Sequence, residues 1–287
     1  MKFLGNLFRF FIYSNLFIAC CAVLMVFQTY GLLLNANPDI PFVLFVFFAT
    51  ITSYSFHWYL TPVLNTAPIA REKWLLAHRN IHAALFIIGI AGAGITGFFL
   101  LDHWQWLLLS AFITFLYSAP KIPHPYFRML RKIALGKTIF LALVWMYVTT
   151  MLPLLISEQP WKTSFTLFSI SRFFLIYAIC ILFDYRDRDY DKTIGIRSLI
   201  TWLSEKGITL LFYGSLILFA ASAIWMIHYG FSLLVIVLLL VPGIITALLF
   251  RHAKRNFSDI LYYFILDGLM ALSAFLTSLL LLKHSKY

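Results

Sequence analysis

The stretch SFTLFSISRFFLIYAICILFDYRDRDYDKTIGIRSL (residues 164–199) decides the fold of this chain. Its first part is an apolar run long enough to cross a bilayer, and we predict a membrane-spanning helix over residues 164–184. Its second part, residues 184–199, is a run of charge that begins where this helix reaches the membrane edge. Four carboxylates beside four basic residues at this boundary require a chemical explanation.

The rest of the chain is equally apolar. Of its 287 residues, 62% are hydrophobic and only 11% are charged, a balance typical of an integral membrane protein and not of a soluble domain. The first apolar stretch is too long for the core of a signal peptide and is interpreted as the first span. A window of about 19 residues predicts about nine spans. Their limits are residues 10–34, 42–62, 81–101, 104–120, 133–157, 164–184, 207–229, 231–250 and 259–282. The predicted fold class is therefore all-α, a polytopic membrane bundle forming one transmembrane domain over residues 1–287.

Loop lengths and the distribution of charge predict the topology of the bundle and its orientation in the membrane. The third and fourth spans are joined through Asp102 and His103, so we expect them to form a tight hairpin. If the N-terminus is cytoplasmic, nearly all basic residues of the loops lie on the cytoplasmic side, as the positive-inside rule requires. We interpret the net charge of +11 as a signal of orientation in a membrane, in preference to a nucleic-acid-binding surface. We expect an integral protein of the bacterial plasma (inner) membrane, in contact with lipid.

The acids of the charged run converge on one side of a helix. At about 100° per residue, Asp184, Asp187 and Asp191 fall within about 60° of one another, whereas Asp189 points elsewhere. Converging carboxylates hold hard divalent cations, and Mg²⁺ takes one or two of them together with water and phosphate oxygens. The sequence therefore predicts a Mg²⁺ site at Asp184, Asp187 and Asp191. The alternative is a solvated loop in which neighbouring bases neutralise the acids, namely Arg186, Arg188 and Lys192.

The spacing of this run resembles a known family, the UbiA superfamily of intramembrane prenyltransferases. The pattern D-x-x-D-x-x-x-D, followed by G-x-[RK]-[ST]-L, is similar to the second Asp-rich motif of that family. It is carried here by Asp184, Asp187, Asp191, Gly195, Arg197, Ser198 and Leu199. A Tyr-Ser-x-Pro-Lys stretch at Tyr117, Ser118, Pro120 and Lys121 also resembles a Tyr-x-x-Pro-x-Lys region of the family. The resemblance implies a nine-helix bundle with Asp-rich loops after the second and sixth helices on the cytoplasmic side.

One motif of the family is missing. After the second helix the family carries another Asp-rich motif, whereas residues 52–74 of this chain contain no Asp, and their only acid is Glu72. His57 is a poor Mg²⁺ ligand, because imidazole suits softer metals. We expect basic residues of this segment, Arg71 and Lys73, to meet phosphate directly as fixed cations.

The resemblance implies a reaction and roles for residues. In the family, Mg²⁺ binds a prenyl diphosphate, the allylic C–O bond ionises, and the carbocation alkylates an aromatic, quinone-precursor or other lipophilic acceptor. Carried over to this chain, Asp187, Asp191 and Arg197 are the expected catalytic residues. The expected diphosphate-binding residues are Lys121, Arg197, Ser198, Arg71, Lys73 and Lys137. Aromatic side chains near the cytoplasmic mouth are candidate walls of the cavity, among them Tyr54, His57 and Tyr117.

Asp267, in the last span, is the one acid inside a predicted span. A charged group at that depth costs on the order of 3 kcal/mol, so we expect it to face the bundle or a polar cavity. It is either a contributor to the site or a buried acid paired with a neighbouring helix.

Two other functions fit parts of the sequence. The first is a catalytically impaired protein of the same kind, which binds a lipid diphosphate or serves as a membrane partner. The second is a transporter, which the many spans and Asp267 suggest. The sequence shows neither the inverted repeat nor the pair of broken helices that such folds often have.

Overall fold

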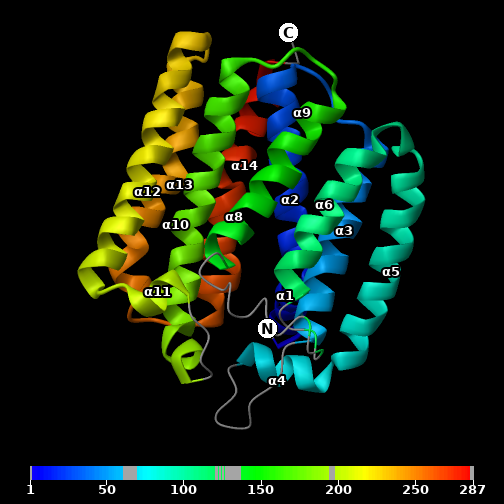
Figure 1. Cartoon of the computed structure of the whole chain (residues 1–287), viewed down its shortest axis with the longest axis vertical. Coiled ribbons are helices and arrows are strands. Elements are labelled where there is room, and N and C mark those ends of the chain that lie inside the picture. The colour runs from blue at the N-terminus through cyan, green and yellow to red at the C-terminus, as the bar shows by residue number, and fades with distance from the viewer. Residues whose placement is uncertain are drawn as a thin grey trace.

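The computed structural model describes residues 2–60, 70–119, 122, 124, 126, 137–193 and 198–284. Within these ranges every regular element is a helix (Figure 1). Eight helical stretches are long and apolar enough to cross a membrane. They are Leu16–Leu34, Ile40–Tyr59, Arg79–Phe98, Thr138–Ile156, Thr163–Asp189, Glu205–Tyr229, Leu233–Ala253 and Leu261–Leu280. The predicted all-α membrane bundle is confirmed.

Three of the spans contain a π-helical segment, labelled η1, η5 and η7. The α-helices are α1 (Lys2–Tyr13), α2 (Leu16–Thr29), α3 (Ile40–Tyr59), α4 (Ala70–Ala77), α5 (Arg79–Phe98), α6 (Trp104–Ser118), α8 (Lys137–Met146), α9 (Leu152–Ile156), α10 (Thr163–Thr193), α11 (Leu199–Trp202), α12 (Glu205–Trp225), α13 (Leu233–Ala253) and α14 (Asp267–His284). The π-helical segments are η1 (Tyr30–Leu34), η5 (Tyr147–Met151) and η7 (Leu261–Leu266), and two 3₁₀ turns are η2 (Leu101–His103) and η6 (Met226–Tyr229).

The predicted fourth span, residues 104–120, corresponds to α6. Its 15 residues extend about 22 Å at 1.5 Å per residue, less than a hydrocarbon core of about 30 Å. The 3₁₀ turn η2 joins α5 to α6, which confirms the turn predicted at Asp102 and His103. The two helices pack on α3 rather than tightly on each other. The start of α1 and the end of α14 lie at opposite ends of the bundle (Figure 1), as an odd number of crossings requires. With α6 counted, the described helices run along the bundle nine times.

The prediction of one continuous helix over residues 10–34 was wrong. The chain breaks at Asn15, whose φ of 69° lies in the left-handed region, so α1 and α2 are separate helices. Ser14 and Asn15 are both fully buried. The physical reason for the break is a distant contact: the Arg71 side chain donates a hydrogen bond from Nη2 to Asn15 Oδ1 at 2.8 Å.

The long helix α10 forms the centre of the bundle. All eight residues from Leu175 to Leu182 are 5% exposed or less, so the helix is covered on every side rather than on one stripe. Figure 1 shows α12 and α13 on one side of α10 and α8 with α14 on the other. Because α10 continues past its apolar part to Thr193, the Asp run is held on a rigid helix and not in a loop.

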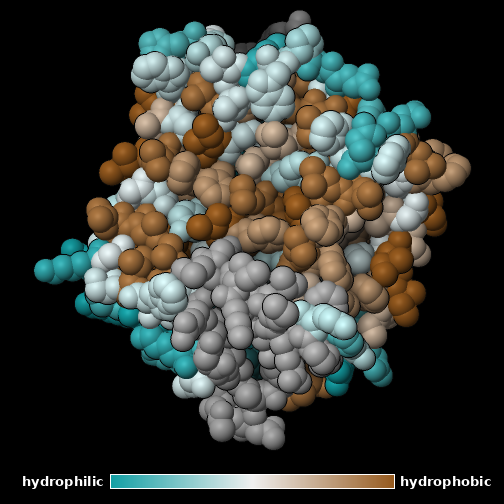
Figure 2. All heavy atoms as spheres, viewed as in Figure 1, coloured by the Kyte–Doolittle hydropathy of each residue, from teal (hydrophilic) through white to brown (hydrophobic). Residues whose placement is uncertain are grey.

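The surface separates an apolar middle from hydrophilic ends. Figure 2 shows apolar side chains across the middle of one face and hydrophilic ones near the top and bottom. α1, α4 and α11 lie at the lower end in Figure 1, which we call the α4 end. Among the described residues, most basic side chains belong to helix termini at this end: Arg9, Arg71, Lys73, Arg79, Arg186, Arg188, Lys192, Lys206, Arg251, Lys254 and Arg255.

Candidate functional site

The three acids predicted to converge all lie near the C-terminal end of α10. Asp184 is 5% exposed and accepts a hydrogen bond from the Thr138 hydroxyl of α8. Asp187 has a side chain that is 38% exposed and pairs with Arg186, whose Nε lies 2.9 Å from Asp187 Oδ1. Asp191 is 3% exposed. The helix therefore presents one acid near its surface between two buried ones.

The carboxylates of α10 are the kind of ligand that Mg²⁺ prefers, but they do not form a complete set of protein ligands around one ion. Within the described ranges no group of three or more His, Cys, Asp or Glu side chains is close enough to hold one metal ion. Mg²⁺ does not need a complete set, because it is usually bound by one or two carboxylates with water and phosphate oxygens completing its shell. Asp187 and Asp191, four residues apart on one helix face, are suited to that mode. The ligand set of Asp184, Asp187 and Asp191 stays a prediction.

Arg71, on the short helix α4, is a buried cation held by aromatic rings. Its exposure is 4%, and its Cζ lies 4.1 Å from the Trp58 ring centroid and 4.0 Å from that of Tyr263. The backbone N–H of Arg71 donates to Asp259 Oδ2 at 2.8 Å. Burial lowers the pKa of the Arg71 guanidinium, while Tyr263 and the carboxylates of Asp267 and Asp259 raise it.

Arg186, on α10, approaches the same tyrosine. Its Nη2 donates to the Tyr263 hydroxyl at 3.0 Å, and its Cζ lies 4.9 Å from the ring centroid. Arg186 thus contacts both Asp187 and Tyr263, and Tyr263 in turn contacts Arg71. We call Arg71, Arg186, Tyr263, Asp187 and Asp267 the paired-arginine cluster. It joins the segment after the second span to the Asp run after the sixth.

Asp267 supplies the cluster with an acid from inside the bundle. It begins α14, one turn after Tyr263, and interacts electrostatically with both Arg71 and Arg186. Of the two interpretations of this residue, its surroundings favour a contributor to the cluster. Two arginines thus contact one tyrosine, and each of the two carboxylates interacts with at least one of these arginines.

The predicted cavity residues of the second and fourth spans lie on α3 and α6. Tyr54 accepts a hydrogen bond from Trp145 Nε1 at 3.0 Å and interacts electrostatically with Asp267. His57 stacks on Tyr117, with ring centroids 5.0 Å apart. Lys73 is exposed on α4, and its side chain takes no part in the cluster.

Several predicted phosphate ligands cannot be placed. Lys121 and Arg197 lie outside the described residues, as does the side chain of Lys137. Ser198 is fully buried and caps α11: its Oγ accepts from the Thr201 N–H at 3.2 Å, while its own N–H donates to Thr201 Oγ1. This hydroxyl therefore has a structural partner, and its predicted role in binding diphosphate stays a prediction.

Tyr263, Asn15 and Asp259 are central to the site but were missed by reasoning from the sequence. Tyr263 carried one usable signal, because it precedes Asp267 by four residues and therefore lies on the same side of a helix. Asp259 also accepts a hydrogen bond from the Tyr13 hydroxyl at 3.1 Å, and burial together with this carboxylate raises the pKa of Tyr13 to about 12. Nothing local in the sequence marks Asn15 or Asp259, since their partners are remote.

Comparison with known proteins adds no family to these observations. No protein-family model, curated protein or solved structure matches this chain.

Proposed function

We propose that this protein is a membrane prenyltransferase similar to the UbiA superfamily, which transfers an isoprenoid from a prenyl diphosphate to an aromatic, quinone-precursor or other lipophilic acceptor. The paired-arginine cluster is the observation that carries this proposal. It joins Arg71, from the segment where the family has its first Asp-rich motif, to Arg186 and Asp187 of the second. Two fixed cations near the carboxylates of α10 suit a ligand that is both negatively charged and metal-binding.

The proposal includes an orientation. We place the α4 end on the cytoplasmic side of a bacterial plasma (inner) membrane, because most described basic side chains gather there, whereas Lys162 lies at the opposite end. The diphosphate would then arrive from the cytoplasm and its isoprenoid chain would extend into the bundle.

The residues of the cluster favour breaking of the allylic C–O bond. The bonding electron pair leaves with the diphosphate, and the positive charges of Arg71 and Arg186 stabilise the negative charge that develops there. An acceptor carbon then forms the new bond to the isoprenoid and loses a proton. We assign that proton to a carboxylate, for which Asp267 is suited because it lies inside the bundle and within electrostatic reach of both arginines.

Asp187 and Asp191 are the residues that would hold Mg²⁺ together with diphosphate oxygens. When bound, the ion supplies further positive charge to the leaving group. The Asp187 carboxylate is now paired with Arg186, so it must exchange that partner when a metal–diphosphate ligand binds.

Release of diphosphate tests this function. The full-length protein, purified in detergent, is mixed with prenyl diphosphates of several lengths and a panel of aromatic acceptors, with and without Mg²⁺, and inorganic diphosphate is measured. We expect Mg²⁺-dependent release and a fall in kcat of about 100-fold for Arg71→Gln, the size typical of losing one preorganised charge-stabilising group. Asp187→Asn should cause a similar loss. Arg251→Gln, which removes an exposed charge at the same end, should keep wild-type rates.

A second candidate function is a protein that binds lipid diphosphate without turnover. The Asp187–Arg186 ion pair favours it, because a carboxylate held by arginine is less available to a metal. Saturable Mg²⁺-dependent binding of a prenyl diphosphate without release or transfer would establish this second function. Absence of both binding and release, with Asp187→Asn indistinguishable from wild type, would contradict both.

A further inference from the structure

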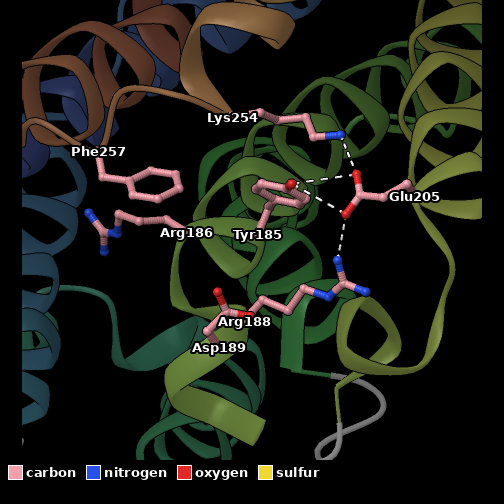
Figure 3. A pocket seen from close by; sticks show the side chains of 7 residues that line it. All are labelled: Tyr185, Arg186, Arg188, Asp189, Glu205, Lys254 and Phe257. Atoms are coloured by element: carbon pink, nitrogen blue, oxygen red, sulfur yellow. Dashed lines mark hydrogen bonds and ion pairs between the residues drawn. The ribbon is translucent and has the colours of Figure 1, made fainter.

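A second charged site lies next to the paired-arginine cluster and shares Arg186 with it. It is a pocket of about 300 Å³ between α10, the start of α12 and the segment after α13 (Figure 3). Three cations line it, Arg186, Arg188 and Lys254, and two acids, Asp189 and Glu205. The mechanism proposed above uses Arg186 but none of the other four.

Three hydrogen-bond donors surround the Glu205 carboxylate (Figure 3). Its carboxylate lies 2.6 Å from Arg188 Nη1 and 2.5 Å from Lys254 Nζ. The Tyr185 hydroxyl donates to the same carboxylate at 3.3 Å. Lys254 Nζ also lies over the Tyr185 ring, 4.6 Å from its centroid. The donors are therefore held by α10 and α13, whereas the acceptor comes from the first turn of α12.

The acceptor is much more exposed than its donors. The Glu205 side chain is 53% exposed, against 17% for Arg188 and 18% for Lys254. An exposed glutamate can rotate into water, but its two cationic partners are mostly buried, so the exchange is favourable only when another anion takes the place of the carboxylate. The donors would then face an anion from outside.

Two arginines that line the pocket also carry donors that Glu205 does not satisfy, and the Arg186 guanidinium points away from Glu205 (Figure 3). Arg188 Nε and Arg186 Nη1 are buried and have no hydrogen-bond acceptor among the described residues. Buried donors without acceptors are costly, and arginine N–H groups in this fork geometry match the oxygens of a phosphate.

We propose that this pocket binds the phosphate group of an anionic lipid and that Glu205 occupies the phosphate position when no lipid is bound. The depth of the pocket fits a lipid headgroup. The apolar part of α10 ends at Phe183, α12 begins at Glu205 and α13 ends at Ala253, so the pocket lies at the boundary between hydrocarbon and water. Leu210 on α12 is 76% exposed and Leu248 on α13 is 77% exposed. These side chains give the acyl chains of a lipid an apolar surface.

Native mass spectrometry of the full-length protein in detergent tests the site. Phosphatidic acid and phosphatidylcholine are titrated separately, and inorganic phosphate is measured in parallel by equilibrium dialysis. We expect phosphatidic acid to be retained in preference to phosphatidylcholine. Arg188→Gln should weaken retention about tenfold or more, because it removes a charged hydrogen-bonding group. Arg255→Gln is the matched control, since Arg255 is exposed on the same end and does not line the pocket.

Glu205→Gln separates binding from a purely structural role. If Glu205 competes with phosphate, this variant should bind phosphatidic acid about two- to fivefold more tightly than wild type. If Glu205 only ties α12 to α10 and α13, the variant should lose thermal stability and gain no affinity, which would overturn the proposal. Equal effects of Arg188→Gln and Arg255→Gln would overturn it as well. Binding of inorganic phosphate that depends on Arg188, with no lipid retained, would support the phosphate site and identify a soluble ligand in place of a lipid.

Discussion

Arg172 is the residue whose surroundings are least expected in a membrane bundle. It is 6% exposed in the middle of α10. Its Nη2 donates to Gln28 Oε1 at 2.7 Å, and its Nη1 donates to the Thr149 carbonyl at 2.8 Å and to Thr29 Oγ1 at 2.9 Å. Every acceptor that it contacts in the described part of the chain is neutral. The guanidinium therefore joins α2, η5 and α10 by hydrogen bonds alone.

Replacing Arg172 should destabilise the fold. Arg172→Leu removes the hydrogen bonds that the guanidinium donates to Gln28 Oε1, Thr29 Oγ1 and the Thr149 carbonyl. The Thr149 carbonyl keeps the Thr29 hydroxyl as a donor at 2.7 Å, but Gln28 Oε1 keeps only the Ser273 hydroxyl at 3.5 Å, and a poorly satisfied buried acceptor of this kind costs about 1–3 kcal/mol. We expect a lower midpoint of thermal unfolding in detergent, followed by fluorescence of the tryptophans. Arg251→Leu, at an exposed site, should change stability by no more than about 0.5 kcal/mol. An Arg172→Leu protein as stable as wild type would show that these hydrogen bonds contribute nothing net.

At the level of single elements, α3 and α5 depend on a close approach of their backbones. A Cβ added at Gly89 of α5 would lie 3.0 Å from the Thr52 backbone N and 3.1 Å from the Phe48 backbone O of α3. A Cβ at Gly94, on the same helix, would meet nothing within 4 Å. Only the first glycine therefore controls the spacing between the two helices.

Leucine at these two positions should have opposite outcomes. Gly89→Leu forces α5 away from α3 and should lower stability by about 1–3 kcal/mol, the usual cost of overpacking. Gly94→Leu replaces a glycine in an open part of the helix by a good helix former and should be neutral or stabilising. Thermal unfolding of the two purified variants compares them directly. Similar losses in both would mean that helix contacts at Gly89 do not set the packing.

Element boundaries show which features local sequence can predict. The end of the third span is predictable, because its apolar run stops at the polar residues Asp102 and His103, which also mark the turn. The break at Asn15 is not, because neither Pro nor Gly marks it and its partner, Arg71, lies 56 residues away. The same holds for the site: spacing along α10 predicts Asp184, Asp187 and Asp191 on one face, whereas the convergence of Arg71 and Arg186 on Tyr263 exists only after folding.

At the scale of the whole molecule, the number of crossings follows from two observations. Eight stretches are long enough to span a membrane, and α6 is shorter but follows α5 through the turn η2. The turns at His103 and Glu158 lie together at the end opposite α4, with His103 Nδ1 3.9 Å from Glu158 Oε1. Hydropathy predicts about nine spans because α6 is apolar throughout, whatever its length.

The side of the membrane on which the α4 end lies can be measured by cysteine labelling. In a background with Cys20, Cys21 and Cys180 replaced by alanine, single cysteines are introduced as Asp102→Cys, Glu158→Cys and Lys206→Cys. Since the described basic side chains gather at the α4 end, an impermeant maleimide should label the first two in intact cells and the third only after permeabilisation. Labelling of Lys206→Cys in intact cells would reverse the orientation and put the paired-arginine cluster outside. Protection of Asp102→Cys alone would show that neither α5 nor α6 crosses the membrane, because the turn between them would then lie on the cytoplasmic side.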